Sequence, residues 1–325
     1  MSSFQTVELA VEYQQQYDAV FPQVLAWNSP DTNLADVESW VQENKPQLLE
    51  DLSLHGAILF RGFPVHSDID FDSFIQAFAL DGFTYADSLS NAVRKNRTDR
   101  VFTANEAPST VSIFLHHEMA QTPVYPSKLF FYCEQAADEG GATPLCRSDI
   151  LLSELEAQAP DFVKNCESKG VRYSNVMPAE DDSESGQGRS WRSTLSVESR
   201  QAAETKLQAL DYQWQWQDDD SLRVTTPVLP AVRTLDDGRR VFFNQLIAAY
   251  RGWKDARNQA EKSICFGDDS AIDAQAMALV IELGDKLSFD VPWQTGDVAL
   301  VDNYLVMHGR RPFSGQRRVL ASLVS

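Results

Sequence analysis

The sequence is poor in cysteine, in basic residues and in long apolar runs, and each shortage excludes a class of protein. Its four cysteines are scattered and show no CxxC or metal-finger spacing. We therefore expect no zinc finger and no disulfide framework, and isolated thiols are typical of a reducing compartment. No apolar run approaches the roughly 18 residues that a membrane helix needs. The first residues, MSSFQTVELAVEYQQQ, have no basic segment before an apolar core, so no secretory signal is expected. Together these absences predict a cytoplasmic protein without a membrane partner.

The charge balance is strongly acidic. Lys and Arg number 28 against 47 Asp and Glu, which gives a formal net charge of −19 and a pI near 4.6. Such a surface repels phosphate backbones and anionic lipids, so a nucleic-acid partner is not expected. Hydrophobic residues make up 43% of the 325 positions, and this composition is typical of a globular protein.

Hydrophobic periodicity predicts helices and short strands in no regular β-α alternation. Helical spacing is clear in four segments, which are 35–52, 68–80, 148–160 and 270–287. Runs rich in Val, Ile, Leu and Phe, bounded by turn residues, predict strands within 55–63, 127–135, 222–232, 239–248, 296–303 and 317–325. This pattern favours a mainly β protein with flanking helices, built on a double-stranded β-helix, or jelly roll, over a parallel sheet.

The expected organisation is one domain over residues 1–325, with an N-terminal helical part at about 1–53. Residues 178–193, PAEDDSESGQGRSWRS, are polar, acidic and rich in Gly and Ser, so they form a loop. Such a loop is either a solvated surface excursion or a lid over a pocket. The oligomeric state is not readable from the sequence.

Two of the five histidines stand side by side in FLHHEMAQ, residues 114–121. On an extended backbone His116 and Glu118 share a face, whereas His117 points to the opposite side, where it packs or hydrogen-bonds. One imidazole and one carboxylate on the same face are two-thirds of a facial metal triad. His308 follows an apolar strand near the C-terminus and is the candidate for a third ligand. The other two histidines, His55 and His66, are interpreted as structural.

Several motifs together resemble one enzyme family. They are FLHHEMAQTPVYPSKLFFYCEQAADEGGATPL from residue 114, FFNQL from residue 242, WQTGDVALVDNYLVMHGRRPFSGQRRVL from residue 293, and HGAILFRGF from residue 55. In order and spacing they are similar to the iron(II)/2-oxoglutarate-dependent dioxygenases of the TauD/TfdA superfamily. The resemblance covers roughly residues 50–325 and is greatest to the syringomycin-type amino-acid hydroxylases.

The resemblance implies a role for each matching residue. His116, Glu118 and His308 would bind iron(II). Arg318 would pair with the distal carboxylate of the cosubstrate 2-oxoglutarate, and Thr143 would hydrogen-bond that same carboxylate. A 2-His-1-carboxylate face leaves iron positions open for the keto acid and for O2. A cationic fork at the other end of a dicarboxylate suits arginine better than lysine.

Two departures from the family pattern narrow the chemistry that the resemblance implies. Taurine-specific enzymes carry a second arginine four residues beyond the cosubstrate arginine, and Ser322 stands there in this chain, so taurine is not the expected substrate. The carboxylate ligand is Glu118 rather than the commoner Asp. A carboxylate at this position also argues against halogenation, because related halogenases have a small residue there.

The expected function is therefore hydroxylation, desaturation or epoxidation of an amino acid, a peptide or a carrier-tethered aminoacyl group in natural-product biosynthesis, with conversion of 2-oxoglutarate to succinate and CO2. Further residues that could contact the substrate are Asn105, Glu106, Trp191, Arg192 and Asn244. An alternative reading is a cupin-like metal-dependent hydrolase or isomerase that uses the same triad. A non-catalytic jelly-roll binding module is the third. A clamp for a dicarboxylate speaks against hydrolysis, which does not need one.

Overall fold

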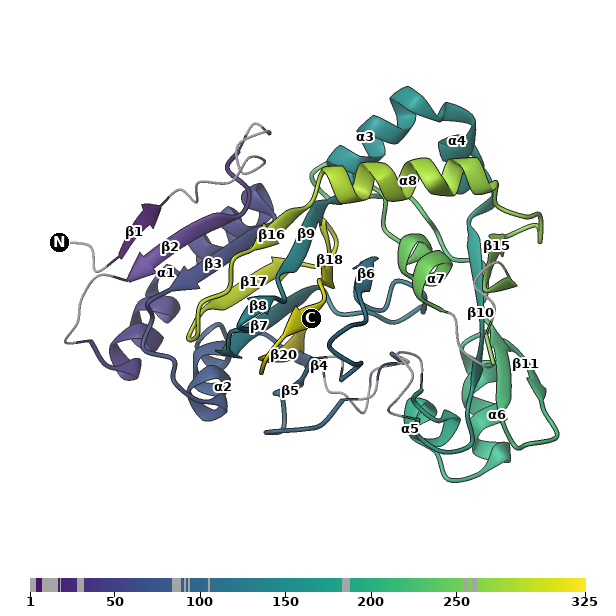
Figure 1. Ribbon diagram of the computed structural model, residues 1–325, viewed down its shortest axis with the longest axis horizontal. Coiled ribbons are helices and arrows are strands. Elements are labelled where there is room, and N and C mark those ends of the chain that lie inside the picture. The colour runs from purple at the N-terminus through teal and green to yellow at the C-terminus, as the bar shows by residue number, and fades with distance from the viewer. Residues whose placement is uncertain are drawn as a thin grey trace.

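The computed structural model shows two facing β-sheets with helices at both ends (Figure 1). It describes residues 4–7, 17, 19–27, 32–83, 89–90, 92, 94–104, 106–182, 188–253, 257–258 and 262–325. Among these residues, no helix is long and apolar enough to cross a membrane. The four cysteines, all of which the structure describes, are free thiols.

The larger sheet has the strand order β1-β2-β3-β17-β7-β20-β4, and β5 also pairs with β20. Neighbouring strands are antiparallel, except that β2 runs parallel to β3. Its strands are β1 (Phe4–Val7), β2 (Gln23–Trp27), β3 (Ala57–Arg61), β4 (Gly82–Phe83), β5 (Phe102–Thr103), β7 (Lys128–Gln135), β17 (Val298–Asp302) and β20 (Arg318–Val324).

The smaller sheet has the order β16-β9-β18-β6. Its strands are β6 (Ile113–His116), β9 (Thr143–Arg147), β16 (Phe289–Val291) and β18 (Val306–Arg310). Along the chain the strands pass back and forth between the two sheets. The strands β5, β7, β17 and β20 belong to the larger sheet and β6, β9, β16 and β18 to the smaller one, in which β9 and β16 are successive. The smaller sheet therefore places β6 and β18 next to each other although they lie nearly 200 residues apart in the sequence.

A third sheet and two pairs of short strands make up the other strands of the described residues. The third sheet, ordered β11-β12-β10-β15, consists of β10 (Val171–Met177), β11 (Gln213–Trp216), β12 (Leu222–Thr225) and β15 (Ile264–Phe266). The paired short strands are β13 (Arg233–Thr234) with β14 (Arg240–Val241), and β8 (Glu139–Gly140) with β19 (Phe313–Ser314).

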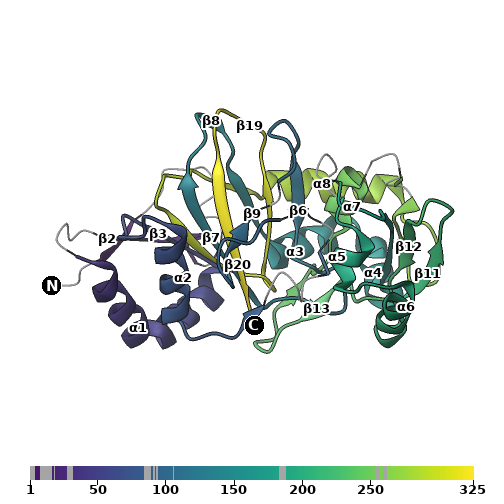
Figure 2. The ribbon, with the colours of Figure 1, turned by 90° about the horizontal axis from the view of Figure 1, so that it is seen from below.

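The helices cover the two ends of the molecule (Figure 2). Helices α1 and α2 lie beside the larger sheet, and α3 to α8 lie beyond the smaller one. They are α1 (Leu34–His55), α2 (Asp68–Ala77), α3 (Ser148–Gln158), α4 (Pro160–Lys169), α5 (Trp191–Leu195), α6 (Arg200–Ala209), α7 (Leu246–Gly252) and α8 (Ala274–Lys286).

The alternation of side chains along β7 explains how the sheets pack. Phe130 and Tyr132 face α1 and α2 in one apolar cluster, whereas Phe131 and Cys133 face the space between the sheets in another. Both faces of the strand are apolar, which is the pattern of a strand buried on both sides. Side chains from both sheets therefore fill much of the space between them, and the candidate site lies in the same space.

Two expectations about local structure were wrong. The N-terminal part is not only helical, because β1 and β2 extend the larger sheet before α1 begins. The run 239–248 is a strand only at Arg240–Val241, and α7 starts at Leu246. Short apolar runs do not distinguish a strand from a buried helix start, and this one combines both.

Candidate active site

Three side chains with metal-binding atoms meet where β6 and β18 lie side by side. His116 ends β6, Glu118 follows two residues later, and His308 lies opposite His116 in the strand pairing. Glu118 Oε2 lies 3.9 Å from His116 Nε2 and 3.6 Å from His308 Nε2. One ligand atom from each residue falls within 4.8 Å of the others. This separation fits three donors around one metal ion, in a 2-His-1-carboxylate set.

The backbone that carries Glu118 is fixed by Asn303, which follows β17. The amide N of Glu118 donates to Asn303 Oδ1 at 2.7 Å, and Asn303 Nδ2 donates to the Glu118 carbonyl at 3.0 Å. His117 is fully buried on the other side, where Nδ1 lies 2.5 Å from the Asn303 carbonyl and the ring packs 4.7 Å from that of Phe243. His117 therefore hydrogen-bonds and packs behind the site, as its position in the sequence predicted.

Electrostatics hold His308 and Glu118 in protonation states that suit a metal ligand. Burial lowers the pKa of His308 to about 4, and His116 adds to that effect, so the imidazole is neutral at pH 7. Burial alone would raise the pKa of Glu118, but the charge of Arg94 and the hydrogen bonds of the two histidines outweigh it. The pKa of Glu118 is therefore held well below its ordinary value, and the carboxylate is ionised.

The three residues line a cavity of about 670 Å³. The wall also carries four arginines, Arg94, Arg251, Arg310 and Arg317, although the protein as a whole is strongly acidic. Apolar parts of the wall come from both sheets. A concave site of this size with a few polar groups is typical of a binding site for a small molecule.

The cationic group beside Thr143 is Arg317, and the assignment of this role to Arg318 was wrong. Arg317 and Thr143 both line the cavity. The Nη2 atom of Arg317 lies 3.5 Å from Thr143 Oγ1, and its Nε donates to the Gly141 carbonyl at 2.8 Å. Arg318 instead has a side chain that is 58% exposed and pairs with Glu134 at 2.8 Å on the outside of the sheet.

The glycines before Thr143 make room for this arrangement. Gly141 has φ +69°, and a Cβ there would lie 2.9 Å from Cδ of Arg317. Both the backbone conformation and the contact favour glycine. Thr143 Oγ1 accepts a hydrogen bond from Trp293 Nε1 at 2.9 Å, so its own proton can be donated into the cavity. Burial, with Arg310 nearby, lowers the pKa of Arg317 to about 10, and the guanidinium stays charged at neutral pH.

Comparison with known proteins identifies the family. The model of the family described as "Taurine catabolism dioxygenase TauD, TfdA family" matches residues 19–323. The chain belongs to this family. It is therefore an oxidoreductase that uses iron(II), 2-oxoglutarate and O2, as the motifs predicted.

Individual TauD/TfdA relatives agree over almost the whole chain. A clavaminate synthase-like protein of Arabidopsis thaliana is 37% identical over 330 residues and covers 99% of both chains. The dapdiamide synthesis protein DdaC of Enterobacter agglomerans is 31% identical over 296 residues, with 85% of this chain and 84% of DdaC covered. The crystal structure of a taurine dioxygenase from Burkholderia xenovorans shares the fold, with a TM-score of 0.54 at 13% identity, covering 100% of this chain and 90% of that one.

None of the expected substrate residues that the structure describes lines the cavity. Glu106 pairs with Lys95 at 3.5 Å. Trp191 is fully buried against Trp216, and its Nε1 donates to the Asp220 carbonyl. Arg192 stacks on the Trp191 ring and pairs with Asp220. Asn244 donates a hydrogen bond to the Ala231 carbonyl. Asn105 lies outside the described residues.

The loop 178–193 contributes to the cavity at one described point. Asp182 lines it and pairs with Arg257 at 2.9 Å. Arg189, farther along, is 2% exposed and binds the Ser90 carbonyl, so this end of the segment packs into the interior. Residues 183–187 lie outside the described part of the chain.

Sequence reasoning missed polar residues of the cavity wall, among them Gln245 and Arg94. Gln245 lines the cavity and donates to the His117 carbonyl at 3.0 Å, whereas its neighbour Asn244 was the one named. Arg94 reaches Glu118 from a segment without any recognisable motif, so no signal in the sequence pointed to it.

Proposed function

We propose that His116, Glu118 and His308 bind iron(II), and that Arg317 and Thr143 bind the distal carboxylate of 2-oxoglutarate. The observation that carries this proposal is that both groups line the same cavity. One group supplies two imidazoles and an ionised carboxylate within 4.8 Å. The other supplies a charged guanidinium and a hydroxyl, and these are the donors that a carboxylate accepts.

In this proposal one set of residues binds the metal ion and another binds and orients the cosubstrate. When bound, iron(II) with 2-oxoglutarate and O2 supplies an oxidant that is strong enough to attack an unactivated C–H bond. His308 and Glu118 need no change of protonation to act as ligands at neutral pH. Arg317 holds the cosubstrate by the end that does not react, and its own orientation is fixed by the Gly141 carbonyl.

We propose that the substrate is an amino acid, a peptide or a carrier-tethered aminoacyl group, and that it is hydroxylated, desaturated or epoxidised. The relative named for dapdiamide synthesis supports a biosynthetic role and the amino-acid hydroxylase branch of the family. Taurine is not favoured. With Arg317 as the cosubstrate arginine, the residue four positions later is Ala321, and neither Ala321 nor Ser322 offers a cation for a sulfonate.

Family membership decides against the hydrolase, isomerase and binding-module alternatives. The chain order of strands between the two facing sheets also supports a jelly roll, which we propose for the whole chain as one domain.

The experiment that tests this function is a substrate screen. The iron-loaded protein is incubated with 2-oxoglutarate and with free, peptidyl or carrier-tethered amino acids, and succinate is measured. We expect one class to stimulate succinate formation well above the rate without substrate, with an oxidised product in equal amount. Oxidised product that forms without consumption of 2-oxoglutarate would contradict the proposal.

A further inference from the structure

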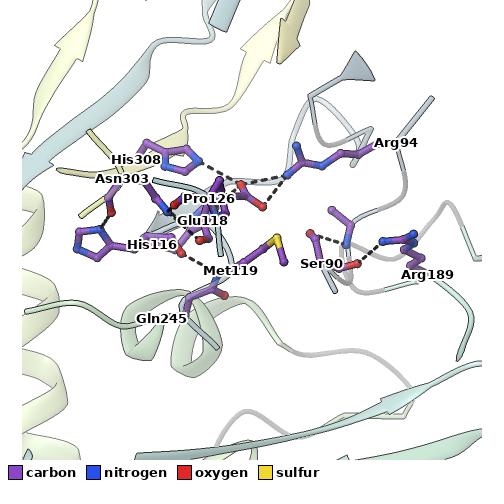
Figure 3. A network of polar contacts seen from close by, with 12 residues as sticks. Ser90, Arg94, His116, Glu118, Met119, Pro126, Arg189, Gln245, Asn303 and His308 are labelled. Atoms are coloured by element: carbon purple, nitrogen blue, oxygen red, sulfur yellow. Dashed lines mark hydrogen bonds and ion pairs between the residues drawn. The ribbon is translucent and has the colours of Figure 1, made fainter. Parts of the chain in front are cut away.

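Arg94 makes a contact with the triad that neither the family resemblance nor the comparisons assign. Its Nη2 atom lies 3.0 Å from Glu118 Oε1 and 3.1 Å from Oε2, so one nitrogen bridges both carboxylate oxygens. Both side chains are almost fully buried, with 7% and 5% of their surfaces exposed. Figure 3 shows Arg94 reaching the carboxylate from the side away from His308.

Glu118 needs such a restraint more than an aspartate would. A glutamate has one more side-chain torsion, so its carboxylate has more orientations to lose when it becomes a ligand. Asn303 fixes only the backbone of Glu118. Among the described residues, the printed contacts to the carboxylate come from Arg94, His116 and His308. Since the histidines are themselves ligand candidates, Arg94 is the group that can hold the carboxylate before a metal ion arrives.

Arg94 also contacts the fold outside the triad. Its guanidinium carbon lies 5.2 Å from the centre of the Phe102 ring in β5. Nearby in the same segment, the Ser90 carbonyl accepts a hydrogen bond from Arg189, which is 2% exposed and lies next to α5. Figure 3 shows the contact of Arg189 with Ser90 close to that of Arg94 with Glu118. The position of Arg94 is therefore set by the fold and not by the carboxylate alone.

We propose that Arg94 is a positioning residue that keeps Glu118 Oε2 turned toward the two imidazoles, so that the metal site is assembled in advance. This inference rests on the proposed function, because it takes the triad as the metal site. A guanidinium also repels a divalent cation, and that effect acts in the opposite direction. The direction in which metal affinity changes when Arg94 is replaced therefore decides between positioning and simple repulsion.

The test is anaerobic titration of the purified full-length protein with Mn(II), with free Mn(II) measured by its electron paramagnetic resonance signal. We expect Arg94→Gln to weaken Mn(II) binding roughly 10- to 100-fold, which is the usual cost of losing a partner that orients a metal ligand. Arg94→Lys should recover part of the affinity, because it keeps the charge and one donor. Lys95→Gln is the matched control, since Lys95 is the next residue, has a side chain that is 73% exposed and should leave binding unchanged.

Two further measurements keep the outcome clear. Circular dichroism of each metal-free variant establishes that it is folded, and Arg94→Lys carries the test if Arg94→Gln does not fold. Glu118→Ala separates the two proposals. If Glu118→Ala binds Mn(II) as the unmodified protein does, the triad assignment fails. If Glu118→Ala loses Mn(II) while Arg94→Gln and Arg94→Lys bind it equally well or more tightly than the unmodified protein, the positioning role of Arg94 is overturned and the triad stands.

Discussion

Replacement of Arg317 should weaken the binding of 2-oxoglutarate, whereas replacement of the adjacent Arg318 should not. Arg317 lines the cavity, and Arg317→Gln removes a charged partner from a buried carboxylate. That loss costs about 2–4 kcal/mol, which corresponds to a roughly 30- to 1,000-fold higher KM for 2-oxoglutarate. Arg318 makes an exposed ion pair with Glu134. Such a pair is worth about 0–1 kcal/mol of stability, so Arg318→Gln should leave the KM unchanged.

The assay is the initial rate of succinate formation at saturating iron and primary substrate, with 2-oxoglutarate varied. The KM for the primary substrate, measured in the same way, should change much less in Arg317→Gln than the KM for 2-oxoglutarate. A high KM for 2-oxoglutarate in Arg318→Gln, with a normal value in Arg317→Gln, would refute the correction made from the structure.

Three further perturbations follow from the contacts of the site. Thr143→Val should raise the KM for 2-oxoglutarate by a smaller factor than Arg317→Gln, since one hydrogen bond of about 1–2 kcal/mol is lost; a KM equal to that of the unmodified protein would contradict it. Asn303→Ala should lower the free energy of unfolding by roughly 3 kcal/mol or more in urea denaturation. The reason is that buried backbone groups of Glu118 and Pro126 lose their hydrogen bonds to Asn303. A loss under about 1 kcal/mol would show that water replaces these hydrogen bonds. The pKa of His308 is about 4 in the folded protein, below its ordinary 6.5, so the unfolded chain binds the proton first as the pH falls. Metal-free protein should therefore lose about 2 kcal/mol of stability from this group between pH 7 and pH 5, and His308→Asn should lose correspondingly less over the same range in urea titrations.

Only part of the triad is local in the sequence. His116 and Glu118 are two residues apart, and their side chains lie together although β6 ends at His116. His308 lies on the neighbouring strand but nearly 200 residues away, and the resemblance of the motifs, not local spacing, assigned it to the same site. The apolar runs around both histidines mark strands that must be buried, and burial leaves few ways to place them. The fold class follows from the same runs, since TauD/TfdA relatives share both the motifs and the fold.

The error between Arg317 and Arg318 has a structural cause. Adjacent residues near the start of a strand point to opposite faces. A prediction that is wrong by one residue therefore names a side chain that points to solvent and not into the cavity. The pairing of β20 with β7 shifts register between Arg318 and Val319, where β7 has an extra residue. A count of residues from His308 cannot detect such a bulge. An error of one residue also affected the pair Asn244 and Gln245. Asn244 was predicted to contact the substrate but packs into the interior, whereas its neighbour Gln245 lines the cavity.

Arg94 was beyond prediction for a different reason. It comes from a loop, and side chains of loops are placed by tertiary contacts, such as that of Arg189 with Ser90. Loop composition indicates exposure but not which side chain turns inward. Trp191 and Arg192 illustrate this limit, because they lie beside a polar loop and yet pack against β11 and the turn at Asp220.

The most direct test of the central claim is the visible absorption of anaerobic protein given iron(II) and 2-oxoglutarate. Chelation of iron by the keto acid produces a metal-to-ligand charge-transfer band, and it requires a face with open adjacent positions. The proposed ligands His116, Glu118 and His308 would leave such a face. The band should grow with 2-oxoglutarate, should be absent with zinc, and should be lost in His308→Ala. Absence of the band in the unmodified protein at saturating iron(II) and 2-oxoglutarate, or an undiminished band in His308→Ala, would contradict it.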